Sequence, residues 1–149
     1  AFKSKKKHWI LMDNRIIDFL SNNHLLSLAT SKGNIPHACN CYYVYDQTQQ
    51  VLIFSSDSKT KHANHFLDNP NVSAAISKDN IDYKKIQGIQ LKGVVHAIQK
   101  DLDRYTEIYL NKFPFAKNMP LYLWFLEIIS VKMTDNNLGF GNKINWKKA

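Results

Sequence analysis

Three short strand-like segments, separated by only a few polar residues, constrain the fold more than any other feature of this sequence. Residues 25–30, 36–45 and 50–55 are rich in β-branched, aromatic and small side chains. The stretches between them, Ser-Lys-Gly-Asn and Asp-Gln-Thr-Gln, have the composition of turns. Because connections this short join neighbouring antiparallel strands, the pattern predicts an antiparallel meander.

The rest of the chain alternates between short helices and further strands. Helical spacing of apolar residues occurs in three places, over residues 9–22, 60–68 and 101–113. Three more strands are predicted, over residues 72–77, 86–99 and 128–132. Gly88 and Gly93 interrupt the longest strand, where glycine often marks a bulge or barrel corner. Ile144 and Trp146 are expected to cap the sheet. The pattern predicts a mainly β fold, a small antiparallel barrel with peripheral helices.

The length of 149 residues is typical of one domain, which we expect to span residues 1–149 with residues 1–8 as a flexible basic tail. Apolar residues make up 44% and charged residues 21%, as in globular proteins. No apolar run approaches the roughly 20 residues that cross a bilayer. The basic start lacks the apolar region of a signal peptide. We therefore expect a soluble, cytoplasmic protein without a membrane partner.

The net charge of +8 is concentrated at the two ends of the chain. Residues 1–15 carry +4 and residues 143–149 carry +3, so the 127 residues between them carry only +1. Lysine-rich ends are usually solvated tails. A nucleic-acid-binding module driven by these ends remains a weak third alternative, and binding to nucleic acid is not expected.

Cys39 and Cys41 are the only cysteines and are separated by one residue. In a strand, their side chains would point to the same face, too far apart for an easy disulfide. They form no C-x-x-C motif, and the six histidines are not spaced as a metal-ligand set. We therefore predict no metal site and interpret both cysteines as small buried or half-buried strand residues.

A polar turn follows the strand that ends near Phe54. It contains several hydroxyl groups and two lysines, Lys59 and Lys61, and it leads into a short helix. Hydroxyls, positive charge and helix N-terminal amides together suit a phosphate. Ser58 or Thr60 is also a reasonable N-cap for the helix, so a solvated surface turn is the competing interpretation. A lysine at a helix start opposes the helix dipole unless an anion binds there, which favours the phosphate.

Several short motifs occur in an order that is shared with a known family. They are LLSLAT (25–30), IPHA (35–38), FSS (54–56), KTKHAN (59–64), NPNV (69–72), QLKGVV (90–95) and LGFGNK (138–143). In this order and spacing the chain resembles the pyridoxamine 5′-phosphate oxidase-like, FMN-binding split barrels, and is most similar to their YhbP-like branch. The resemblance covers about residues 10–146.

The resemblance implies a six-stranded split barrel that forms a homodimer, with FMN in clefts at the dimer interface. The implied cofactor contacts are ring contacts from His37, Ala38 and Cys39, ring and ribityl contacts from Phe54, Ser55 and Ser56, phosphate contacts from Lys59, Thr60 and Lys61, and contacts from the second subunit by Gln90 and Trp124. No catalytic side chain is predicted, because hydride transfer at a flavin need not use one.

The chain also departs from the family pattern. The true oxidases carry an arginine-led motif that binds the FMN phosphate, whereas the matching strand here reads HACNC (37–41). The two arginines, Arg15 and Arg104, do not fit that role, and the oxidases' C-terminal substrate-binding segment is not recognisable. We therefore expect a flavin-dependent oxidoreductase of unknown substrate, not a pyridoxine phosphate oxidase. The alternative is a non-catalytic binding protein for flavin, haem or another planar ligand, with His37, His62 or His96 as a haem ligand.

Overall fold

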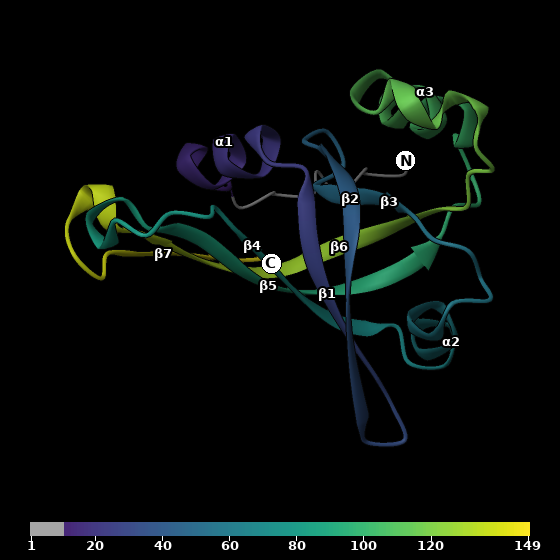
Figure 1. The fold of residues 1–149 in the computed structure, drawn as a ribbon, viewed down its shortest axis with the longest axis horizontal. Coiled ribbons are helices and arrows are strands. Elements are labelled where there is room, and N and C mark those ends of the chain that lie inside the picture. Colours follow the sequence, from purple (N-terminus) through teal and green to yellow (C-terminus); the bar gives the residue numbers. More distant parts are fainter. Residues whose placement is uncertain (1–10) are drawn as a thin grey trace, which may run out of the picture.

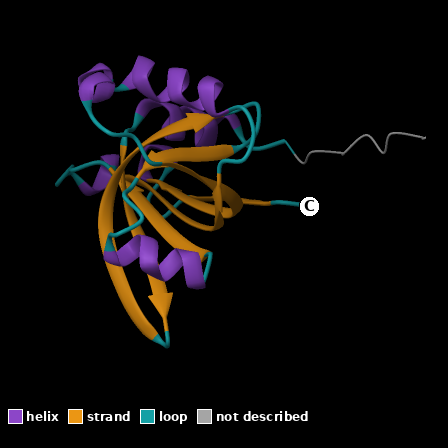
Figure 2. Cartoon of the chain, turned by 90° about the vertical axis from the view of Figure 1, so that its right-hand side faces the viewer, coloured by secondary structure: helices purple, strands orange, loops and turns teal. Residues whose placement is uncertain are grey.

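The β-strands form one strongly curved sheet with the helices packed around it (Figures 1 and 2). This computed structural model describes residues 11–149, so the predicted tail of residues 1–8 lies outside the described residues. The strands are β1 (Leu25–Lys32), β2 (Ile35–Asp46), β3 (Val51–Ser55), β4 (Asn71–Ser77), β5 (Gln87–Ala97), β6 (Leu123–Asp135) and β7 (Lys143–Lys147). The α-helices are α1 (Asn14–Asn22), α2 (Lys61–Asp68) and α3 (Leu102–Lys112). Short 3₁₀ turns cover Tyr83–Lys85, Pro114–Asn118 and Asn136–Leu138.

Six of the seven strands close into a barrel. The sheet order is β3-β2-β1-β4-β5-β6-β7, and an additional β3–β6 pairing joins the first six strands into a ring. The start of β6 pairs with β3, while its later part, from Ser130 to Thr134, pairs with β7. The predicted barrel of six strands is therefore confirmed, and β7 is a seventh strand that the sequence did not predict. Ile144 and Trp146, expected to cap the sheet, are its two buried residues.

The predicted meander is confirmed, and two element boundaries differ from the prediction. β1, β2 and β3 are consecutive antiparallel neighbours. The first helix begins at Asn14 because the Asp13 carboxylate caps it by accepting a hydrogen bond from the Arg15 amide. β6 begins at Leu123 rather than near residue 128, because the earlier apolar residues pair with β3.

Two separate groups of apolar side chains hold the helices to the barrel. β1 and β4 alternate between exposed and buried residues, which directs one face of each strand into the main core. α1 and α2 contribute to this core through Phe19 and Phe66, which are 5% and 2% exposed. α3 instead covers a smaller cluster in which Tyr109 and Phe113 pack against Ile53 of β3.

Gly93 lies where β5 packs closely against β6. The register of these strands shifts between Lys92 and Gly93, so the predicted irregularity is confirmed there, whereas Gly88 pairs in register. A Cβ atom at Gly93 would lie 2.3 Å from Leu126 Cδ2 and 2.6 Å from the Glu127 carbonyl oxygen. Both strands would have to separate to admit a side chain. In the described part of the chain, no helix is long and apolar enough to cross a membrane.

Candidate functional site

The polar turn after β3 is an ordered N-terminal cap for α2. The Thr60 hydroxyl accepts a hydrogen bond from the Ala63 amide at 3.3 Å and donates one to the Asp57 carbonyl at 2.8 Å. Ser56 Oγ lies 3.3 Å from Thr60 Oγ1. Of the two cap candidates named from the sequence, Thr60 is the residue that caps. The helix itself supplies no acceptor to the Lys61 and His62 N–H groups, so these two first-turn amides are donors that an anion can use.

Positive charge gathers at this end of α2. Lys59 and Lys61 are exposed, and the first turn of the helix contains no acidic residue. Lys32, from the β1–β2 hairpin, reaches the same helix and donates to Asn64 Oδ1 at 3.0 Å. Asp57, a carboxylate within the turn, accepts a hydrogen bond from the Lys59 amide at 2.9 Å, so one backbone donor of the turn is already used.

Two aromatic side chains, Trp124 and Phe66, lie next to the turn. The Trp124 indole N–H donates to the Ser56 carbonyl oxygen at 2.7 Å, and the Trp124 ring lies 4.9 Å from that of Phe66. Phe54 pairs with Trp124 across β3 and β6, and the whole residue is buried. The Ser55 hydroxyl accepts from the Tyr122 amide at 3.1 Å. The structure thus brings together the predicted residues from Phe54 to Lys61 with Trp124 of the same chain.

Three histidine side chains, those of His37, His62 and His65, lie close together next to these aromatic residues. The rings of His37 and His62 lie parallel, with centroids 6.3 Å apart, and His65 meets His37 edge-on at 5.8 Å. His62 Nε2 is hydrogen-bonded to Ser56 Oγ, and His65 Nδ1 to the buried Thr30 hydroxyl at 3.1 Å. Burial, together with the nearby His37, lowers the pKa of His62. The neutral imidazole is therefore favoured at this position.

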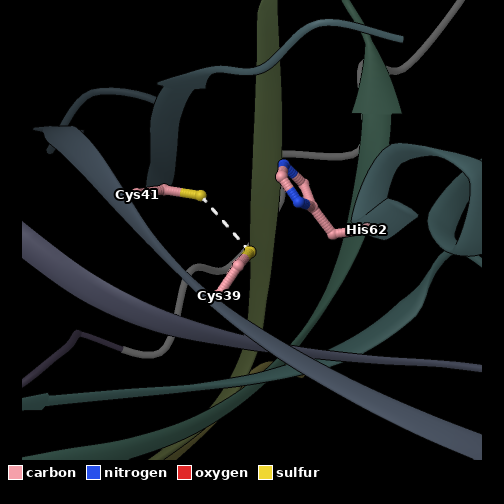
Figure 3. Close-up of side chains that lie close together, drawn as sticks. All are labelled: Cys39, Cys41 and His62. Carbon is pink, nitrogen blue, oxygen red and sulfur yellow. Dashed lines mark hydrogen bonds between the residues drawn. The ribbon is translucent and has the colours of Figure 1, made fainter. Parts of the chain in front are cut away.

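The two cysteines lie next to the histidines. Cys39 and Cys41 share one face of β2, as predicted, with their sulfur atoms 3.9 Å apart. Their hydrogen bond lowers the pKa of the Cys39 thiol; the same contact, together with burial, raises that of Cys41. A ligand atom of His62 lies within 4.8 Å of both sulfurs (Figure 3). The absence of a metal site therefore stays a prediction, although α2 packs across β2 and brings a third potential ligand beside the two cysteines.

Ala38 and Gln90 lie apart from these residues. Side chains alternate along β2, so Ala38 points to the opposite face from His37 and Cys39. It helps to line an open groove of about 860 Å³ on the outer face of the sheet, which Gln90 of β5 also lines. Small side chains such as Ala29 and Ala75 form much of the groove floor. The candidate cofactor residues of β2 therefore lie on both faces of that strand.

The other side chains considered from the sequence, those of His96, Arg104 and Arg15, form ion pairs away from the turn. His96 is paired with Glu127 at 2.9 Å and stacks on Phe125, so it does not join His37 and His62. Arg104 forms two hydrogen bonds with Asp46, at 2.9 and 3.2 Å. Arg15 is bound to Asp13 at 2.8 Å. Neither arginine is therefore available to the turn at α2.

Comparison with related sequences shows the family to which this chain belongs. A UPF0306 protein of Yersinia pestis is 32% identical over 141 residues, which cover 94% of each chain. The chain is a member of the UPF0306 family. A UPF0306 protein of Yersinia pseudotuberculosis matches to the same extent. No family model matches the chain.

Solved structures share the fold of this UPF0306 protein, that of a split barrel. A heme-binding protein of Mycobacterium smegmatis aligns with a TM-score of 0.74 and 16% identity, covering 93% of this chain and 60% of that chain. A FAD-binding protein of Mesorhizobium loti gives 0.66 and 18%, covering 83% and 92%. A Clostridium acetobutylicum protein of the NimC/NimA family gives 0.64 and 22%, covering 89% and 91%. The predicted fold class is confirmed.

Proposed function

We propose that this protein binds FMN and acts as a flavin-dependent oxidoreductase, with the flavin phosphate at the start of α2. The observation that carries the proposal is the combination of Lys59, Lys61 and the first-turn amides with a helix start that has no acidic residue. Structural neighbours that bind FAD or haem support a planar ligand in this fold. The order of short motifs favours the YhbP-like branch.

The chain's own residues would hold the cofactor in three parts. Lys59, Lys61 and the Thr60 region would bind the phosphate, while Ser55 and Ser56 would contact the ribityl chain. His37 and Cys39, on the α2 side of β2, would lie near the ring. When bound, FMN supplies the redox chemistry, and these residues orient it.

A second copy of the chain would complete the cleft. The open groove over β1, β4, β5, β6 and β7 exposes small and apolar groups, which suit a homodimer interface. Gln90 lies in this groove and would reach the cofactor of the partner. Trp124 is bound to Ser56 of its own chain, so we assign it to its own site rather than to the partner's.

Titration of the purified protein with FMN and with riboflavin tests the phosphate assignment. Lys61→Ala should weaken FMN binding by about 10- to 100-fold, because a charge-assisted hydrogen bond contributes about 1.5–3 kcal/mol. Riboflavin, which lacks the phosphate, should bind the variant as it binds the parent. Lys117→Ala, an exposed lysine near α3, is the matched control and should change neither ligand. Equal losses for both ligands, or no binding at millimolar FMN, would contradict the proposal.

A non-catalytic haem-binding role is the second candidate, favoured by the pairing of His37 with His62. It predicts a haem absorption spectrum that changes when either histidine is replaced. Replacement of His96, which is paired with Glu127, should leave that spectrum unchanged.

A further inference from the structure

Cys39, Cys41 and His62 form a cluster of metal-ligating groups, of which the proposed flavin site uses only Cys39. Cys39 and Cys41 come from alternate positions of β2, and His62 comes from the first turn of α2. All three ligand atoms lie within 4.8 Å of one another (Figure 3). The cluster contains no carboxylate, so its ligands are sulfur and imidazole nitrogen alone.

Ordered elements hold the three side chains in place. The cysteines are fixed by the β1–β2 ladder, in which Cys39 pairs with Leu28 and Cys41 with Leu26. His62 lies in a helix that is capped by Thr60 and contacts β2 directly. Because each ligand stands on a helix or strand, little ordering is required when an ion binds.

The separation of the sulfur atoms fits a metal ion better than a disulfide. Two thiolates bound to tetrahedral Zn²⁺ at about 2.3 Å lie about 3.8 Å apart. The observed Sγ–Sγ distance is 3.9 Å, whereas a disulfide requires about 2.05 Å. Sulfur and nitrogen ligands of one zinc ion lie about 3.6 Å apart. A movement of the imidazole by about 1 Å therefore closes the set.

We propose that Cys39, Cys41 and His62 bind one thiophilic d¹⁰ metal ion, with Zn²⁺ as the reference ion. Thiolate and imidazole ligands select zinc over magnesium or calcium, which prefer oxygen. As each sulfur–metal bond forms, its thiol proton passes to solvent, so two protons are released and no electron is transferred. Three protein ligands leave a fourth position open, as in exchangeable or catalytic zinc sites.

Ser56 would be the positioning residue of this site. Its hydroxyl is hydrogen-bonded to His62 Nε2, which assigns Nδ1 to the metal. Histidines that bind metals usually use the second ring nitrogen in such a bond, which fixes the ring orientation. The proposal does not rest on flavin binding, because every contact that it uses is made by side chains of the flavin-free chain.

Titration of the reduced, flavin-free protein with Co²⁺, a spectroscopic substitute for Zn²⁺, tests the site. We expect one cobalt per chain, with a thiolate-to-cobalt charge-transfer band that Zn²⁺ abolishes. Because the chain has only two cysteines, such a band can arise only from Cys39 and Cys41. Cys39→Ser should remove about half of the band intensity, and the double variant with Cys41→Ser all of it.

Two further variants distinguish the role of His62, the proposed metal ligand, from that of Ser56, the residue that positions it. His62→Asn should weaken cobalt binding by at least about 100-fold, and Ser56→Ala by about 10- to 100-fold, with Ser56→Thr restoring it. His96→Asn is the matched control and should bind as the parent does. Thermal unfolding without metal establishes that each variant is folded. No charge-transfer band, a stoichiometry of two chains per cobalt, or a band unchanged in Cys39→Ser would overturn the proposal.

Discussion

The helices α2 and α3 have similar lengths, but their first turns differ in charge. α3 carries Asp103 in its first turn and Lys112 in its last, so its charges complement the helix dipole. α2 has no acidic residue in its first turn and instead places Lys61 there, against the dipole. The charges of α3 are complete without a ligand, whereas an anion would complete those of α2. The contrast supports the proposal that the start of α2 binds a phosphate.

The two helices also differ in the core that they join, and the largest expected effect tests this difference. Phe66 of α2 is 2% exposed in the main core, and Phe113, which follows α3, is 4% exposed in the smaller cluster. Phe66→Ala and Phe113→Ala should each lower the free energy of unfolding by about 3–5 kcal/mol, measured by urea denaturation.

Ligand binding should distinguish these two variants. Phe66 contacts the rings of Trp124 and His62, so its loss should also weaken FMN and cobalt binding. Phe113→Ala should leave both affinities unchanged. If either alanine variant does not fold, the Leu variants provide the same comparison with a smaller loss. Equal effects on ligand binding would show that the two helices do not differ in this way.

Lys112 gives the next largest effect, through its response to pH. Its ammonium donates to the Asn23 carbonyl at 2.6 Å and lies 4.9 Å from the Tyr43 ring centroid. Burial lowers its pKa from 10.5 to about 8. The unfolded chain therefore binds more protons than the folded chain between these values, and the free energy of unfolding rises with pH across that window. Since solvent screens a half-buried group, we expect a rise of about 1–2 kcal/mol rather than the full shift.

Urea denaturation of the parent and of Lys112→Met at about pH 7.5 and 9.5 measures this rise. The difference between the two proteins isolates Lys112 from the tyrosines, of which Tyr45 has its pKa raised to about 12 by burial and by the neighbouring Asp46. The Met variant should lack the rise. An identical pH dependence in both proteins would contradict the assigned titration.

Local patterns in the sequence predicted most of the fold. The short turns predicted the meander of β1, β2 and β3. β7 was missed because only Ile144 and Trp146 alternate within its five residues, after a glycine-rich turn. No local pattern reveals that such a segment continues a sheet, since its partner is the later part of β6.

The candidate site was only partly predictable, for a similar reason. The turn from Ser56 to Lys61 is contiguous, so its hydroxyls and lysines could be read together as an anion site. The cluster of Cys39, Cys41 and His62 depends on how α2 packs across β2, a contact between residues about 20 positions apart. The sequence signals available for this cluster were the spacing of Cys39 and Cys41, which places them on one face of a strand, and His62 at the start of the following helix.

Charge reversal at the two helix starts gives the smallest effect and the sharpest test of the comparison. In the ligand-free protein, Lys61→Glu should raise the free energy of unfolding by about 0.5–1 kcal/mol, because an acidic residue suits the positive end of α2. Glu and Lys have similar helix propensities, so this change isolates the charge. The matched variant Asp103→Lys, at the start of α3, should lower the free energy of unfolding by a similar amount.

FMN titration completes this test, since Lys61→Glu should stabilise the empty protein while it abolishes phosphate recognition. Asp103→Lys should destabilise the protein and leave FMN binding unchanged. A site selected for ligand binding at the expense of stability shows this inverse relation, because the lysine is unfavourable until an anion neutralises it. If Lys61→Glu lowered both stability and FMN affinity, the lysine would be a structural part of α2, and the two helices would follow the same design.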